Sequence, residues 1–207
     1  MTARTAARRR PVSPASELEG LLKEIRACRV CAACLPHEPR PIVRASATSR
    51  LVICSQAPGT RVHETGLSFN DASGDRLRAW LGIDRDTFYD ERRISIIGMG
   101  FCFPGQDKNG GDLPPRKECA PLWQTRLFGE LPRVELKLLV GTYALAWHLK
   151  GRTKANMTET VRAWQEYLPE FIPLPHPSWR NNAWIKRNPW FEAELLPELR
   201  ARVHALL

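Results

Sequence analysis

LVICSQAPGTRVHETGLSFNDASGDRLRAWL, residues 51–81, predicts a buried strand, a long polar loop and a helix, in that order. Residues 51–54 are apolar and β-favouring, and a Pro-Gly turn ends the strand. After Gly74 the apolar residues recur at a helical spacing, with Ser73 or Asp71 as the N-cap. Ligands of open α/β sheets bind beyond the carboxyl ends of the strands, so we expect a site in this loop.

Further apolar runs and helical periods extend the same pattern along the chain. The other predicted strands are residues 94–99, 136–140 and 171–174. The other predicted helices are residues 16–28, 121–131, 144–151, 161–168 and 189–207, with Ser16 and Glu19 forming a capping box and Gly151 closing its helix. This alternation predicts a three-layer α/β/α domain around a central, mainly parallel, four-stranded sheet.

The length of 207 residues suits one domain, which we expect to span residues 16–207. Residues 1–15 are rich in Arg, Ala and Pro, and we expect them to be a disordered basic arm. No apolar segment follows the arm as in a secretory signal, and no apolar run approaches the ~20 residues of a membrane span. We therefore expect a protein of the cytoplasm with no membrane partner.

Basic residues outnumber acidic ones, with 31 Lys and Arg against 22 Asp and Glu and a formal charge of +9. Such an excess attracts polyanions, and nucleic acid first among them. Many basic proteins bind no polyanion, so the charge alone leaves the partner open.

Six cysteines in such a protein favour metal ligation or buried thiols over disulfides. The Cys-x-x-Cys turn at 28–31 lets two thiolates converge on one metal or cluster, and Cys102 and Cys119 could complete a zinc or iron-sulfur site. Cys54 lies inside a strand and is expected to be a buried apolar residue. Cys34 is either a replacement ligand or a free thiol. The alternative is that none of them binds metal.

Two loops at strand ends carry most of the polar and aromatic groups that could form a pocket. One runs from SQAPG to FND and the other is HPSWRN, and both should open on the same edge of the sheet. Together they contain Gln56, His63, Glu64, Phe69, Asn70, Asp71, His176 and Asn181. This set suits a flat, hydrogen-bonding ligand such as a nucleobase. The structural alternatives are a core position for Phe69, and solvated charges or helix caps for Glu64 and Asp71.

These residues resemble the uracil-DNA glycosylase superfamily, and most closely its iron-sulfur family 4. SQAPG followed by GLSFNDASG is similar to that family's first motif, GEAPG followed by GxPFVGxAG, and HPSWRN is similar to its second, the HPS segment. Cys28, Cys31, Cys102 and Cys119 are laid out as are its [4Fe-4S] ligands. The resemblance covers residues 27–182.

The resemblance implies an enzyme that flips uracil out of DNA and hydrolyses its N-glycosidic bond, leaving an abasic site. By motif, Phe69 would stack on the base and His176 would hydrogen-bond uracil O2. The backbone at Gln56 and Ala57 would shape the pocket, and Asn70 would read the base.

The resemblance also implies which residues contact DNA. A Pro-Gly turn keeps the first loop close to the DNA backbone, and HPSWRN presses the minor groove, with Trp179 or a neighbour filling the vacated space. The DNA-contacting residues expected are Pro58, Gly59, Ser178, Trp179, Arg180 and Asn181. We expect a monomer of bacterial type, associated with the nucleoid through DNA, whose cluster is structural.

The chain departs from the family at three positions. Gln56 stands where family 4 has Glu, Ala57 stands where the first-described enzymes have a catalytic Asp, and Gly98 lies about where family 4 has an Asn. The water-positioning carboxylate is therefore expected to be Glu64 first and Asp71 second, with His63 weaker. The alternatives are a low-turnover protein that captures uracil or abasic sites, a glycosylase for a broader range of deaminated bases, and a zinc module or unrelated α/β protein.

Overall fold

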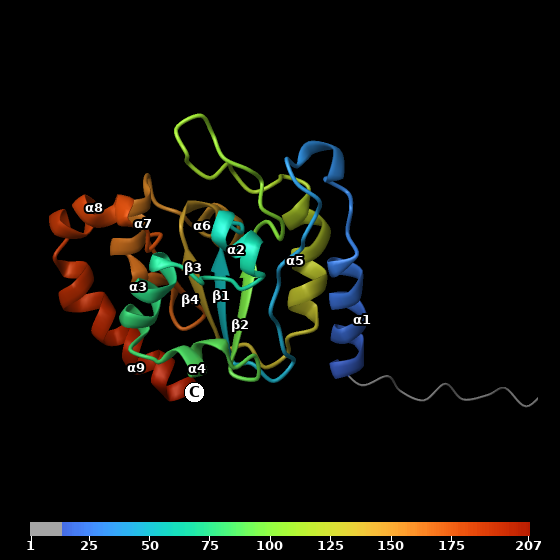
Figure 1. The fold of residues 1–207 in the computed structure, drawn as a ribbon. Helices are drawn as coiled ribbons and strands as arrows, with labels where there is room; N and C mark the ends of the chain where they lie inside the picture. The colour runs from blue at the N-terminus through green and yellow to red at the C-terminus, as the bar shows by residue number, and fades with distance from the viewer. Residues whose placement is uncertain (1–13) are drawn as a thin grey trace, which may run out of the picture.

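The computed structural model describes residues 14–207, in which a four-stranded sheet lies between two layers of helices (Figure 1). The strands are β1 (Leu51–Ser55), β2 (Ile94–Gly98), β3 (Leu136–Val140) and β4 (Phe171–Leu174), in the order β2-β1-β3-β4. Each neighbouring pair is parallel, and Leu51 of β1 is in register with Ile94 and Leu136. The predicted fold class is confirmed. Residues 1–13 of the predicted basic arm lie outside the described residues.

The side chains of β1 alternate between the two helical layers. Leu51 and Ile53 pack with α3 (Ala72–Leu81) and α9 (Leu196–Leu206) on one face of the sheet. Val52 and Cys54 pack on the other face with α1 (Pro14–Arg26), α5 (Cys119–Gly129) and α6 (Thr142–Leu149). Cys54 is fully buried, as predicted, and burial raises the pKa of its thiol.

Several predicted helices begin or end elsewhere. α1 starts at Pro14, so Ser16 lies inside the helix and is not its N-cap. The side chain of Asn156 accepts a hydrogen bond from the Glu159 amide, which starts α7 (Met157–Arg162) before the predicted residue 161. A 3-10 turn, Trp164–Tyr167, follows α7. The predicted final helix divides into a π turn, Phe191–Leu195, and α9.

Three short helices are absent from the sequence prediction: α2 (Thr60–Thr65), α4 (Arg85–Tyr89) and α8 (Asn182–Arg187). Each has five or six residues, too few to show a helical period. α2 matters most, because it occupies the middle of the loop expected to bind the ligand. The left-handed Gly66 ends this helix.

His148 on α6 is a half-buried base whose protonation should couple to stability. Its ring lies 5.2 Å from that of Phe128 and 6.3 Å from that of Phe171, between centroids. Burial, together with the charges of Lys137 and Lys150, lowers the pKa of His148 to about 4. The unfolded chain binds this proton near the ordinary pKa of ~6.5, so stability is lost as the pH falls from there towards 4, by roughly 3 kcal/mol in all.

Replacing His148 by Leu should remove this pH dependence. Urea unfolding at about pH 7 and about pH 5 should show that the free energy of unfolding falls by about 2 kcal/mol more in the wild type than in the variant. Other acid-sensitive groups are common to both proteins and cancel in the comparison. Equal losses in the two proteins would contradict the prediction.

Candidate active site

The carboxyl ends of β1, β3 and β4 bring the two predicted loops together around Gly141. This glycine follows β3 with a φ of +84°, and a Cβ there would lie 3.4 Å from Gln56 Cγ and 3.6 Å from His176 Cβ. Side chains of the SQAPG and HPSWRN loops therefore meet beside one residue that has no side chain of its own.

The SQAPG loop is fixed to the segment that follows β2. The Met99 amide donates to the Ser55 carbonyl at 2.9 Å, and the Gly100 amide donates to the Gln56 carbonyl at 2.8 Å. A Cβ at Gly100 would lie 3.3 Å from that of Ala57. These contacts hold the backbone at Gln56 and Ala57 in one conformation.

Phe69 has a left-handed backbone, with a φ of 56°. Its carbonyl lies against Gly74, where a Cβ would come within 1.7 Å of the oxygen, and accepts a hydrogen bond from Arg78 Nη1 at 3.4 Å. Its ring is nearly buried and meets Phe88 edge-on, with 6.1 Å between centroids. A non-glycine residue held at positive φ is strained, and such strain is concentrated at functional sites.

Asn70 and Asp71 follow Phe69 and are both held by hydrogen bonds. Asp71 is the N-cap of α3, and its Oδ1 accepts from the Gly74 amide at 2.9 Å. Asn70 Oδ1 accepts from Arg85 Nη2 at 2.8 Å, so its side-chain amino group is the part left for a ligand. Asp71 thus takes the structural role of a cap while its charge remains beside the site.

Glu64 and His63 lie on α2 and are not among the groups nearest Gly141. Arg40 donates to the backbone carbonyls of both residues, and the Glu64 side chain is exposed. The His63 ring stacks on His37 at 5.1 Å and lies 5.7 Å from Phe103. Burial lowers the pKa of His63, and the neighbouring His37 lowers it further.

His176 is a partly buried imidazole at the end of β4. Burial lowers its pKa, Asp71 and Asp112 oppose that shift, and Arg180 adds to it. The ring is therefore neutral at neutral pH and has one N–H donor and one acceptor nitrogen. The Asn181 side-chain amino group donates to the His176 carbonyl at 2.6 Å, which closes the HPSWRN turn.

Trp179 and Arg180 of HPSWRN face solvent. Trp179 is 72% exposed, and the Arg180 guanidinium lies 5.7 Å from its ring centroid. The Ser178 carbonyl accepts from Arg76 Nη1 at 3.0 Å, which fixes the loop to α3. A bulky aromatic ring and a guanidinium on a fixed loop beside the site could both contact a polyanion.

The structure adds Asp112, a carboxylate that neither motif contains. It lies on the loop between β2 and α5, which projects over the carboxyl edge of the sheet (Figure 1). A Cβ at Gly59 would lie 2.9 Å from Asp112 Oδ2, and the Asp112 charge acts on His176. In the sequence, only the glycine-rich stretch at residues 105–111 marks this loop, and the approach of Asp112 to Gly59 is a contact between distant segments.

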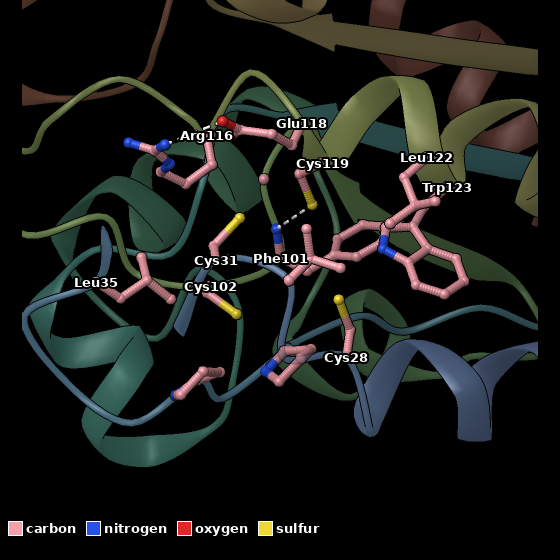
Figure 2. Close-up of a pocket in the computed structure, with 14 residues that line it drawn as sticks. Cys28, Cys31, Leu35, Phe101, Cys102, Arg116, Glu118, Cys119, Leu122 and Trp123 are labelled. Carbon is pink, nitrogen blue, oxygen red and sulfur yellow. Dashed lines mark hydrogen bonds and ion pairs between the residues drawn. The ribbon is translucent and has the colours of Figure 1, made fainter. Parts of the chain in front are cut away.

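Four cysteines line a second pocket (Figure 2). Its other walls are mainly apolar and include Leu35, Phe101, Leu122 and Trp123. The thiols are those of Cys28, Cys31, Cys102 and Cys119. Cys34 is exposed and does not line this pocket.

The thiols of this pocket are close enough to affect one another. Burial, with a smaller contribution from Cys28 and Cys31, raises the pKa of Cys102 to about 11 and that of Cys119 to about 12. Within residues 14–207, no group of three or more His, Cys, Asp or Glu side chains is arranged to hold a single metal ion. The pocket therefore has four soft donors in an apolar setting without the convergence of a mononuclear site.

A protein-family model described as the uracil DNA glycosylase superfamily matches residues 43–200. The matched segment contains both loops of the site, together with Cys102 and Cys119, while Cys28 and Cys31 precede it. Over the described residues, no helix is both long and apolar enough to cross a membrane.

Proposed function

The chain belongs to the uracil DNA glycosylase superfamily, and from that premise we propose that it excises uracil from DNA and leaves an abasic site. Membership supports a DNA glycosylase role in general, and the choice of uracil is the step that we add. The observation that carries it is the meeting of Gln56 and a neutral His176 beside Gly141. This pairing offers an amide and an imidazole N–H to the polar edge of a base.

In the proposed reaction, the C1′–N1 bond breaks and its electron pair passes to uracil, where the negative charge spreads to O2. The neutral His176 donates a hydrogen bond to that oxygen, and the bond strengthens as the charge grows. A donor directed at a developing oxyanion contributes roughly 3 to 4 kcal/mol to the transition state. Water adds to C1′, and the products are uracil and an abasic site.

The remaining pocket residues would orient the base. Phe69 supplies the stacking ring, the fixed backbone at Gln56 and Ala57 shapes the pocket, and the Asn70 amino group reads the base edge. Because the Phe69 ring is almost buried, base entry requires a small displacement that exposes its face. The strained φ of Phe69 favours such a displacement.

The two carboxylates expected to position water should respond differently to substitution. Asp71→Asn should lower the excision rate at least tenfold, because the Asp71 charge acts on His176 and lies beside the site. Glu64→Gln should change the rate less than about threefold, because Glu64 is exposed on α2. Asparagine is as good an N-cap as aspartate, so α3 should stay intact. Single-turnover rates on a uracil oligonucleotide would measure the effects of both substitutions. Equal, small effects would exclude both residues as the group that positions water.

On the DNA side, Trp179 and Arg180 would face the minor groove, with Ser178 and Asn181 shaping the loop. Pro58 and Gly59 would keep the first loop against the DNA backbone. A monomer suffices for this arrangement, because all the proposed groups belong to one chain. The formal charge of +9 supports binding to DNA, and we place the protein with the nucleoid in the cytoplasm.

The four cysteines of the second pocket would hold a [4Fe-4S] cluster. The fit rests on four thiols around one apolar pocket, and each thiol binds a different iron of such a cluster, so they need not converge on one point. When bound, the cluster links the segment after α1 to the 102–119 loop and thereby orders a wall next to the site. The catalytic roles stay with the residues of the motif loops.

Incubating the purified protein with a uracil oligonucleotide and then treating it with alkali tests the proposal, because alkali cleaves the strand at an abasic site. The absence of a carboxylate at Ala57 favours a second candidate, a low-turnover protein that captures uracil or abasic sites. That candidate predicts tight binding without strand cleavage. A panel of deaminated bases distinguishes uracil specificity from a broader range.

A further inference from the structure

The side chain of Asp112 occupies the space that a Cβ at Gly59 would take. The φ of −87° and ψ of −179° of Gly59 are extended backbone, which any residue adopts, so its conformation does not require glycine. A Cβ there would instead lie 2.9 Å from Asp112 Oδ2, closer than such atoms pack. Glycine at this position therefore lets the SQAPG loop and the Asp112 carboxylate lie in direct proximity, and a Cβ would displace the end of the Asp112 side chain.

Backbone pairing within its loop fixes the position of Asp112. The backbones of Asp112 and Gln106 form an isolated antiparallel β-bridge, and the Leu113 amide donates to the Gly105 carbonyl at 2.9 Å. Asp107, another carboxylate of the loop, accepts hydrogen bonds from the amides of Asn109 and Gly111 at 2.7 and 2.9 Å and is used within the turn.

Asp112 accepts fewer hydrogen bonds within the loop than Asp107 does, so its carboxylate has more capacity left for a water molecule. Gln106 Nε2 makes a long contact of 3.4 Å with Oδ1, while Oδ2 faces Gly59. The side chain is exposed, so water reaches it. The Asp112 charge raises the pKa of His176, so the carboxylate lies near enough to the imidazole to act on it.

Asp112 is also unusual as a negative charge at the edge of a basic protein that is proposed to face DNA. The chain has a formal charge of +9, and a carboxylate at a DNA-facing edge repels phosphate. Asp107 lies near Arg180, so the loop extends from the SQAPG side of the site to the HPSWRN side. An acidic group kept at this position against its electrostatic cost would have a chemical role.

We propose, on the basis of the proposed function, that Asp112 holds and activates the water that attacks the deoxyribose. The water oxygen bonds to C1′, the C1′–N1 bond breaks and leaves its electron pair on uracil, and the water proton passes to the Asp112 carboxylate. The proton then leaves to solvent or to the uracil anion. Asp71, fixed by its bond to Gly74, supplies negative charge that stabilises the positive charge developing at C1′.

Gly59→Ala and Asp112→Asn, alone and combined, test this assignment in single-turnover excision from a uracil oligonucleotide. Asp112→Asn should lower the rate by on the order of 10²-fold. Gly59→Ala should displace the carboxylate and lower the rate at least tenfold, and the double variant should be no slower than Asp112→Asn. Oligonucleotide affinity should stay equal or rise in Asp112→Asn, because a charge that repels phosphate is lost.

Asp86→Asn on α4 is the matched control, since it removes another exposed carboxylate, on a helix at the opposite end of the sheet (Figure 1). Its rate should match the wild type. An active wild type with Asp112→Asn within about threefold of it overturns the assignment, as do multiplicative losses in the double variant. A wild type that leaves uracil in place overturns the proposed function itself. Thermal unfolding of each variant excludes a folding defect.

Discussion

Replacing His176 by alanine is expected to slow uracil excision by on the order of 10²-fold or more, with little loss of DNA affinity. The imidazole meets the SQAPG loop beside Gly141, and burial lowers its pKa. In the proposed reaction, a neutral ring would donate to O2 without bringing a positive charge to the base. The loss should therefore appear in the single-turnover rate and not in oligonucleotide binding.

The pH dependence checks the same role. Because the pKa of His176 lies below its ordinary value, the neutral donor persists as the pH falls through about 6.5 and is lost only at lower pH. His176→Gln keeps a donor at this position and should recover part of the rate lost in His176→Ala. A decrease below tenfold in His176→Ala, or equal rates in the two variants, would exclude His176 as the oxyanion donor.

Replacing Cys119 by serine is expected to abolish the proposed cluster and to lower the Tm by roughly 10 °C or more. Cys119 opens α5 and lines the same pocket as Cys28, Cys31 and Cys102, so loss of the cluster would separate the segment after α1 from α5 (Figure 2). Iron and sulfide analysis of anaerobically purified protein, with thermal unfolding, measures both effects. The wild type should contain about four of each per chain.

Cys34→Ser is the matched control, because this thiol is exposed on the same N-terminal segment and does not line the pocket. Its iron content and Tm should equal those of the wild type. Loss of iron in Cys34→Ser would instead make Cys34 a ligand, and a colourless wild type containing zinc would exclude the iron-sulfur assignment.

Strong local patterns let the sequence predict the sheet. Residues 51–54 are continuously apolar, and the structure buries all four at the centre of a parallel sheet. Gly82, in the left-handed conformation, ends α3 directly after the stretch at residues 51–81. Ser16 was wrongly predicted as an N-cap, since α1 begins at Pro14. α2 was missed because six residues between two glycines carry no period.

The candidate site was predictable only where its residues belong to the motif loops. Glu64 ranked first because it is near Gln56 in sequence, but α2 leaves its side chain exposed. Asp71 was expected to be either a cap or a catalytic group, and the structure shows that it is a cap with its charge beside His176. Asp112 reaches Gly59 through a fold-back of the loop, and no local pattern encodes such a contact.

The most direct test of the account is excision of uracil by the wild-type protein, purified anaerobically with its iron intact. The substrate is a labelled single-stranded oligonucleotide containing one uracil, and hot alkali reveals abasic sites as strand breaks. We expect strand cleavage that continues beyond one product per protein chain and no cleavage of the matched thymine strand. An intact uracil strand after incubation with stoichiometric, folded, iron-loaded protein would contradict the account.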